Sequence, residues 1–212
     1  MLRWRIIFTR GEELKYLSHL DLMRLWERAF RRAGVPLAYS QGFSPHPRLS
    51  LAAPLPVGVT GLGELMEVFL KRPLPRHRLA PALAHSLPRG IEVLGLDPAP
   101  PQAPSLPSQV RWATYRVEVE DSPERGAVEA AIGSFLQARS LPWQHQRDQE
   151  VRRYDLRALV QELSVEAAGP PLTLGMKLIC SPQGSGRAEQ VALALGLKPG
   201  NICRLALGLE AP

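Results

Sequence analysis

The first hundred residues alternate between short apolar segments and polar or turn-forming stretches. Residues 3–9 (RWRIIFT) are rich in β-branched and aromatic side chains and predict a strand. Residues 18–33 predict an amphipathic helix, because apolar side chains recur every three or four positions. These apolar side chains are Leu22, Trp26, Phe30 and Ala33. Ser18 precedes the helix and resembles an N-cap, with Asp21 three residues later as in a capping box.

Four more segments complete a β-α-β-β-α-β order in this half. They are a short strand around 48–53, a strand over 64–70, a helix over 79–86 and a strand over 91–96. The second half repeats the order less regularly: strand 114–120, helix 123–139, extended segment 151–156, helix or strand 159–165, strand 172–179, helix 187–195 and strand 202–207. We therefore predict an α+β fold with two tandem ferredoxin-like domains and antiparallel sheets.

A segment rich in proline separates the two halves. Five prolines lie between positions 98 and 107, without apolar periodicity, which indicates a stiff extended connector that joins neither a helix nor a central strand. We predict an N-terminal basic domain over 1–97, a linker over 98–110 and a C-terminal domain over 111–212.

The charge of the chain is concentrated in its first half. The net charge is +6, and residues 1–100 hold 14 Lys and Arg against 8 Asp and Glu, whereas residues 101–212 hold 12 of each. An excess in one half suggests one face that attracts polyanions, although such an uneven distribution also arises by chance.

The predicted first helix carries a row of arginines beside its apolar stripe. Arg24, Arg28, Arg31 and Arg32 are spaced so that they share one side of the helix. The acids of that helix are Asp21 and Glu27, too few to neutralise the row. Guanidinium groups bind phosphate with two donors, so we expect nucleic-acid phosphates here; the alternative is an ordinary solvated helix face.

The segment 39–48 (YSQGFSPHPR) mixes aromatic, polar and basic side chains in one loop. Tyr39 and Phe43 are candidates to stack on bases, and Ser44, His46 and Arg48 are candidates to contact phosphate or ribose. The alternative is a rigid proline-rich turn whose aromatic side chains fill the core.

Two histidines are the candidate catalytic residues. His19 lies in the first turn of the predicted helix and His46 in the loop, so they would form one site if the loop folds over that helix end. Two histidines beside phosphates support acid–base cleavage of RNA, but isolated histidines more often only donate or accept hydrogen bonds. We expect no metal site, because Asp21 and Glu64 have no diagnostic ligand spacing.

The chain is expected to be cytoplasmic, without a membrane partner or a cofactor. It has two cysteines, Cys180 and Cys203, and no apolar run of about 20 residues that would cross a bilayer. No Gly-x-Ser-x-Gly, His-Glu-x-x-His or Cys-x-x-Cys motif is present, so the usual hydrolase, zincin and dithiol signatures are absent.

Three motifs resemble a bacterial family of unknown function that is linked to radical SAM proteins. They are FTRG at 8–11, YLSHLDLMR at 16–24 and PLAYSQGFSPHP at 36–47, with PLPVG at 54–58 beside them. The resemblance is specific over about residues 3–72. Members of that family are encoded beside, or fused behind, a radical SAM protein with a B12-binding-like region, often near genes for ribonuclease G and ribosomal proteins.

This resemblance implies a radical SAM partner and an RNA-related setting, but no catalytic residue. The chain lacks the three-cysteine motif that holds the iron–sulfur cluster of a radical SAM enzyme. A looser resemblance, in fold order and charge only, is to the endoribonucleases that process CRISPR repeats. This chain lacks their clear glycine-rich motif at the C-terminus.

Three hypotheses follow. The leading one is a non-catalytic RNA-binding adaptor that presents rRNA or tRNA to a radical SAM enzyme for modification or processing. The second is a metal-independent endoribonuclease that uses His19 and His46. The third is a protein-interaction subunit whose basic face meets an acidic patch of the radical SAM partner.

Overall fold

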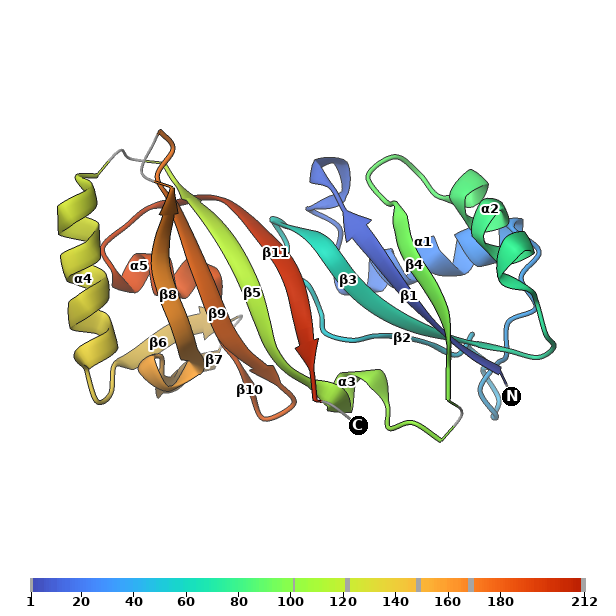
Figure 1. The fold of residues 1–212 in the computed structure, drawn as a ribbon. Coiled ribbons are helices and arrows are strands. Elements are labelled where there is room, and N and C mark those ends of the chain that lie inside the picture. Colours follow the sequence, from blue (N-terminus) through green and yellow to red (C-terminus); the bar gives the residue numbers. More distant parts are fainter. Residues whose placement is uncertain (1, 101, 121–122, 148–149, 168–169, 211–212) are drawn as a thin grey trace. The chain divides into compact units, whose positions relative to one another are not determined.

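The computed structural model describes residues 2–100, 102–120, 123–147, 150–167 and 170–210 (Figure 1). The chain divides into two compact units, of which the first runs to Val110 and includes Glu210, and the second is Arg111–Leu209. Five α-helices and antiparallel strand pairs are found in the described residues, so the α+β class is confirmed. No helix in these ranges is long and apolar enough to cross a membrane.

The first unit is a four-stranded antiparallel sheet with its two longer helices on one face. Its elements are β1 (Leu2–Arg10), η1 (Glu12–Leu14), α1 (His19–Arg32), β2 (Leu49–Leu51), β3 (Val59–Leu70), α2 (Arg76–Ser86), β4 (Val93–Ala99) and α3 (Leu106–Gln109). The strands lie in the order β2-β3-β1-β4. Two long strands therefore occupy the centre of the sheet.

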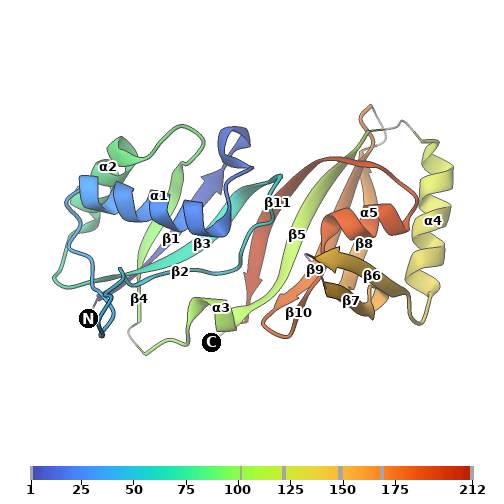
Figure 2. The ribbon, with the colours of Figure 1, turned by 180° about the vertical axis from the view of Figure 1, so that it is seen from behind.

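Strand alternation sorts the side chains of this sheet between two faces. Ile6 of β1 and Val68 of β3 point into a core that α1 closes with Leu22, Trp26 and Phe30, three of the four predicted residues. Figure 2 shows α1 lying across the sheet. The predicted N-cap is also present, because the Ser18 Oγ accepts a hydrogen bond from the backbone N–H of Asp21 at 3.2 Å.

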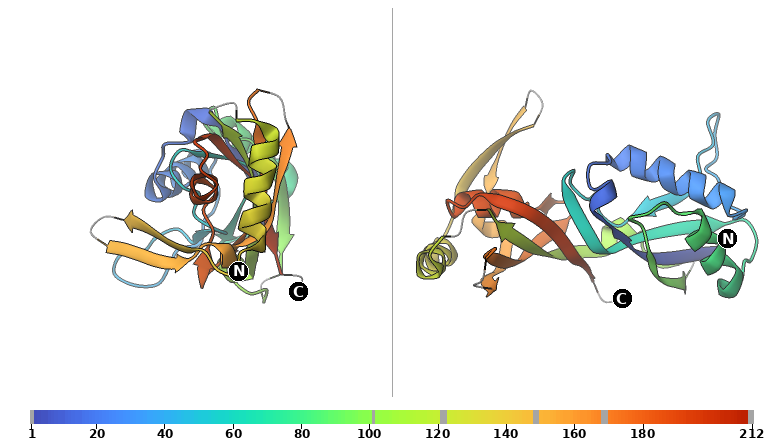
Figure 3. Two further views of the ribbon diagram at one scale, coloured as in Figure 1. Left: turned by 90° about the vertical axis from the view of Figure 1, so that its left-hand side faces the viewer. Right: turned by 90° about the horizontal axis from the view of Figure 1, so that it is seen from above.

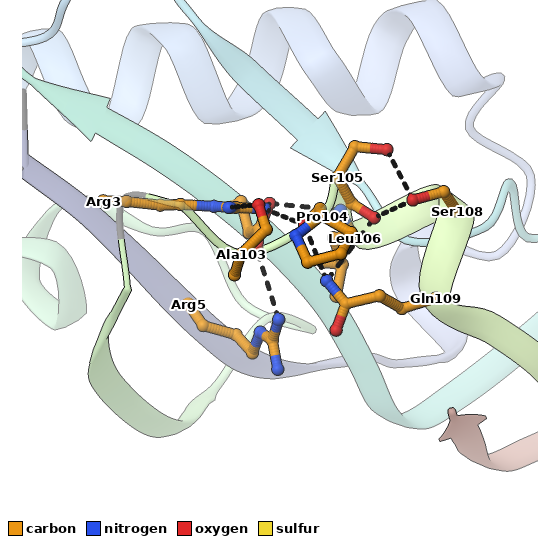
Figure 4. A network of polar contacts seen from close by, with 9 residues as sticks. Arg3, Arg5, Ala103, Pro104, Ser105, Leu106, Ser108 and Gln109 are labelled. Carbon is orange, nitrogen blue, oxygen red and sulfur yellow. Dashed lines mark hydrogen bonds and ion pairs between the residues drawn. The ribbon is translucent and has the colours of Figure 1, made fainter. Parts of the chain in front are cut away.

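A buried ion pair occupies the opposite face. The carboxylate of Glu67 pairs with Arg3, and both side chains are almost completely buried. Arg5 approaches the other carboxylate oxygen at 3.2 Å. The backbone N–H of Leu106 donates to Glu67 Oε2 at 3.3 Å, and Arg3 donates to the carbonyl of Pro104 at 2.7 Å. Figure 4 shows how this network holds the chain before α3 against β1.

The expectation that no part of 98–110 joins a helix is wrong. Pro98 continues β4, which is an edge strand and therefore tolerates proline. Pro107 lies in the first turn of α3, where its missing N–H leaves no helical hydrogen bond unmade. The segment thus belongs to the structure of the first unit.

The glycine-rich stretch before the predicted strand 64–70 is also strand. β3 begins at Val59, and Gly61 pairs with Arg10 of β1. Backbone pairing with a long neighbouring strand extends β3 through residues whose own strand propensity is low.

The second unit carries an antiparallel sheet and a separate hairpin. Its elements are β5 (Val110–Val119), α4 (Arg125–Gln137), β6 (Pro142–Arg147), β7 (Glu150–Asp155), η2 (Arg157–Leu159), β8 (Val160–Ala167), β9 (Thr173–Ser181), β10 (Gly184–Ser185), α5 (Ala188–Ala194) and β11 (Pro199–Leu209). The sheet order is β9-β5-β11, with β8 and β10 both pairing with β9. The segment 159–165, for which helix and strand were both open, forms strand β8. Strand β6 was not predicted.

Asp155 ties the base of the hairpin formed by β6 and β7. Its Oδ1 accepts hydrogen bonds from the backbone N–H groups of Leu141 at 2.8 Å and of Arg157 at 3.0 Å. The bond from Leu141, with further help from Ser140, Ala158 and Arg157, lowers the pKa of Asp155 below its usual range.

This lowered pKa predicts an acid-sensitive hairpin. The stabilisation is present above the unfolded pKa of about 3.9 and is lost as pH falls through the lower folded value. As pH falls through the folded pKa of Asp155, amide hydrogen exchange in β6 and β7 should accelerate more than the pH dependence of exchange in an unfolded chain accounts for. In Asp155→Ala these amides should already exchange fast at neutral pH and show no such acceleration. The same acceleration in that variant would exclude Asp155 as its cause.

Candidate nucleic-acid interface

The row of arginines predicted on α1 is exposed to solvent. Arg24, Arg28, Arg31 and Arg32 all lie outside the buried stripe of the helix. Two of them have local partners: Arg24 pairs with Asp21 at 3.4 Å, and Arg32 donates to the carbonyl of Ser86 at 2.6 Å, at the end of α2. A cation beside the carbonyls of a helix C-terminus is favourable, so Arg32 also has a structural role.

Arg28 and Arg31 have no ion pair or hydrogen bond to another described residue. Their guanidinium groups are therefore available for a ligand, one helical turn apart on the outer face of α1. These two arginines are the strongest phosphate-binding candidates of the row.

The loop 39–48 forms a narrow hairpin. Tyr39 bridges to Pro47, the Ser40 N–H donates to the His46 carbonyl at 2.9 Å, and the His46 N–H donates back to Ser40 Oγ at 3.0 Å. Gly42 turns the tip with a φ of 125°, a region that favours glycine. The backbone of the loop is thus defined by its own hydrogen bonds.

The side chains of this loop point outward. Phe43 is fully exposed, Ser44 and His46 are exposed, and Lys71 lies 5.1 Å from the centre of the Tyr39 ring. The alternative that both aromatic side chains fill the core is therefore wrong. Figure 3 shows the loop rising on the same side of the sheet as α1. An exposed aromatic ring on the side of a basic helix suits base stacking.

Arg48 is not part of that surface. Its guanidinium lies 4.3 Å from the centre of the Phe69 ring. Phe69 alternates with Val68 and Leu70, which face α1, so Phe69 and Arg48 lie on the opposite face of the sheet. We therefore separate Arg48 from the arginines of α1.

The structure does not bring His19 and His46 together. His19 begins α1 beside the end of β1, where Arg10 pairs with Gly61 and reaches the Leu17 carbonyl. The loop that carries His46 is tied by the Ala38 N–H to the carbonyl of Phe69. Eight residues of β3 separate these positions, roughly 26 Å along a strand. A catalytic site with both histidines does not form in this arrangement.

The described part of the chain also offers no cluster of three or more His, Cys, Asp or Glu side chains that could hold a metal ion. What this face presents is cationic and aromatic. Arginine side chains are suited to phosphate and an exposed aromatic ring to base stacking, and neither interaction requires proton transfer.

An exposed apolar patch on the same unit was missed by the sequence reasoning. Tyr16, Leu20 and Val57 are 72, 64 and 60% exposed. Their segments are joined because the Gly58 N–H donates to the Lys15 carbonyl at 2.8 Å. The buried Arg10 also binds the carbonyls of Lys15 and Pro56, at 3.1 and 2.8 Å. These residues belong to the motifs at 16–24 and 54–58, but the sequence does not show that the two motifs lie close together.

These features define a mixed α+β protein with antiparallel sheets, a basic helix and an exposed aromatic loop. The chain belongs to a bacterial family described as "Uncharacterized protein conserved in bacteria (DUF2344)", whose model matches residues 3–188. The family part of the resemblance is thereby confirmed. No curated protein matches the chain.

Two solved structures that match this chain are distant from it in sequence. A chain of "Crystal Structure of a Cbf5-Nop10-Gar1 Complex" is 10% identical, with a TM-score of 0.51; the match covers 97% of this chain and 49% of that one. This chain therefore spans about half the length of that structure. A chain of "Crystal structure of putative glycine cleavage system transcriptional repressor" is also 10% identical, with a TM-score of 0.26; the match covers 96% of this chain and 98% of that one. At this identity the first similarity concerns the fold alone.

Proposed function

We propose that this protein is an RNA-binding accessory protein that presents a structured RNA to a radical SAM partner enzyme. One observation carries the RNA-binding part: Arg28 and Arg31 stand unneutralised on the outer face of α1, on the side of the sheet where the loop with Phe43 rises. Arginine forks bind phosphates, and an exposed ring stacks on unpaired bases. Together they suit an RNA with helical and irregular parts, such as rRNA or tRNA.

Two tandem ferredoxin-like units are the fold we infer for this role. The strand orders β2-β3-β1-β4 and β8-β9-β5-β11 both place the first and third strands of a β-α-β-β-α-β unit at the centre. The second unit departs from that pattern by the hairpin between α4 and β8. In a ferredoxin-like unit, β6 and β7 are therefore an insertion between the first helix and the second strand.

The partner enzyme is inferred from the family resemblance. The motifs at 8–11, 16–24 and 36–47 resemble a family encoded beside or fused to radical SAM proteins. A chain that binds RNA and holds no cluster motif of its own fits the role of substrate presentation. The modification chemistry would then reside in the partner.

Charge reversal on α1 tests the proposal. We expect Arg28→Glu with Arg31→Glu to weaken binding to total cellular RNA at least tenfold at low salt, an order-of-magnitude estimate for losing about two phosphate contacts. The dependence of the logarithm of affinity on the logarithm of salt should become shallower by about 1.5. Filter binding over a salt series measures both quantities.

A matched variant controls for net charge. Arg116→Glu with Arg125→Glu changes the charge equally on the second unit, where both arginines are exposed and paired with Glu166 and Glu129. This control should weaken binding much less. Equal losses in the two variants, or no detectable binding by the wild type, would contradict the proposal.

The apolar patch favours a second candidate, a protein-interaction subunit. Tyr16, Leu20 and Val57 expose a surface of the kind found at protein contacts. Co-purification of the radical SAM partner that survives ribonuclease and is lost in Leu20→Asp would support this candidate. Loss of the partner after ribonuclease alone would support presentation of RNA instead.

A further inference from the structure

The hairpin of the second unit carries a hollow of about 630 Å³. It is formed at the paired ends of β6 and β7, with Ser140 at its base. Figure 3 shows the hairpin standing away from the sheet of its unit. A projecting hairpin with a concave surface is more than a connection requires, because two or three residues would have sufficed to join α4 to the next strand.

The two faces of this hairpin differ. Opposed residues share a face and neighbours alternate, so the register places Gln144 and Arg153 on one face, with Pro142 and Asp155. We call this the hollow face. Trp143, His145, Arg152 and Tyr154 form the other, anchored face, and of these Trp143 and Tyr154 also line the hollow.

The anchored face holds the hairpin to the rest of the unit. The Trp143 Nε1–H donates to Gln190 Oε1 of α5 at 2.6 Å. The rings of His145 and Tyr154 meet edge to face, with centroids 5.6 Å apart. Burial raises the pKa of Tyr154, partly offset by the charge of Arg187. These contacts hold Trp143 and Tyr154, two of the side chains that line the hollow, and so fix part of its wall.

The hollow face offers groups that suit a nucleotide. Arg153 is exposed and has no ion pair or hydrogen bond to another described residue. Its guanidinium can bind a phosphate with two donors. Gln144, also exposed and directly opposite Arg153, offers an amide donor and acceptor for the edge of a base. Pro142 supplies an apolar surface beside them, and Asp155 is occupied by the backbone of the hairpin base.

We propose that the hollow face binds a nucleotide of an unpaired RNA segment, with Arg153 on the phosphate and Gln144 on the base edge. An unpaired segment is required, because a base within a duplex presents neither its pairing edge nor its face to such a surface. This inference rests on the proposed RNA-binding function and adds to it a second contact region, on the unit without excess charge.

The neighbouring arginines provide a matched test. Arg152 and Arg153 are adjacent and both exposed, but they lie on opposite faces. The probe is a fluorescent oligouridine of about 12 nucleotides, within the usual length for single-strand sites. We expect Arg153→Glu to weaken its binding about tenfold and Arg152→Glu several-fold less, since only Arg153 makes a charge-assisted contact.

Further variants and measurements complete the experiment. Gln144→Ala should also weaken binding of oligouridine, and an RNA duplex of equal length should not respond to Arg153→Glu. Ultraviolet crosslinking of oligouridine to the wild type should map to β6 or β7. Circular dichroism spectra and melting temperatures like those of the wild type establish that each variant is folded.

The outcomes separate this inference from the proposed function. Equal effects of Arg152→Glu and Arg153→Glu would mean only long-range attraction and would overturn the hollow as a site. Binding of structured RNA that depends on Arg28 and Arg31, without any binding of oligouridine, would also overturn it while leaving the proposed function intact. If the wild type binds neither RNA, both proposals fail.

Discussion

Replacing Glu67 by alanine should destabilise the first unit by about 3–5 kcal/mol, the usual cost of leaving one partner of a buried ion pair alone. Arg3 would remain almost fully buried with its charge uncompensated. The backbone N–H of Leu106 would also lose its acceptor. Because the chain has two units, the measurement is native-state hydrogen exchange of amides in β1 and β3, which reports this unit separately.

An exposed pair provides the comparison for Glu67. Arg76 and Asp97 are 3.2 Å apart with both side chains more than half exposed, so Asp97→Asn should cost at most about 1 kcal/mol. Arg3→Met combined with Glu67→Leu should recover much of the loss, because neither charge of the buried pair remains, although Arg5, 27% exposed, loses its carboxylate partner. Recovery should be incomplete, since the carbonyls of Ala103 and Pro104 lose their donor. A Glu67→Ala variant as stable as Asp97→Asn would refute the assigned role.

Replacing Trp26 by alanine should have a comparable effect, about 3–5 kcal/mol, because it leaves a large cavity under α1. The Trp26 side chain is completely buried. Its ring lies 5.0 Å from that of Phe8 in an edge-to-face contact and 5.5 Å from that of Phe30. The same exchange measurement should show loss of protection in β1 and β3.

Phenylalanine at position 26 tests the reason for this loss. The Trp26 Nε1–H is buried and has no acceptor among the described residues. Trp26→Phe therefore removes an unsatisfied donor together with part of the ring, and we expect it to cost well under half as much as Trp26→Ala. Equal costs would indicate that the indole N–H is hydrogen-bonded in solution, for example to a buried water.

Sequence periodicity predicted the elements whose pattern is local. The α1 helix was predicted within one residue at each end, because its buried residues recur every three or four positions and its cap lies in sequence beside it. The register of β3 with β1 depends on contacts between distant residues, so the glycines before Glu64 concealed five residues of strand. The same reason explains why β6 was missed, since its pairing with β7 is not visible in β6 alone.

In the candidate site, too, features set by local sequence were predicted and features set by distant contacts were not. Exposure of Arg28 and Arg31 follows from the apolar stripe of their own helix, and exposure of Phe43 from a glycine-containing loop tip. In contrast, the separation of His19 from His46 and of Arg48 from α1 depends on sheet register and on strand alternation. The types of neighbouring residues in the sequence therefore could not show which candidate side chains lie together and which lie apart.

The attachment of the chain before α3 determines where an independent first unit can end. A fragment that stops at residue 97 would lack the carbonyls of Ala103 and Pro104 and the side chain of Leu106, which is fully buried. Water would then reach the Arg3 and Glu67 pair, and the sheet would present an uncovered face prone to self-association. Recombinant expression of this unit alone is therefore best attempted with a terminus at or after Val110, and a protease acting on the native chain should spare the peptide bonds around Leu106.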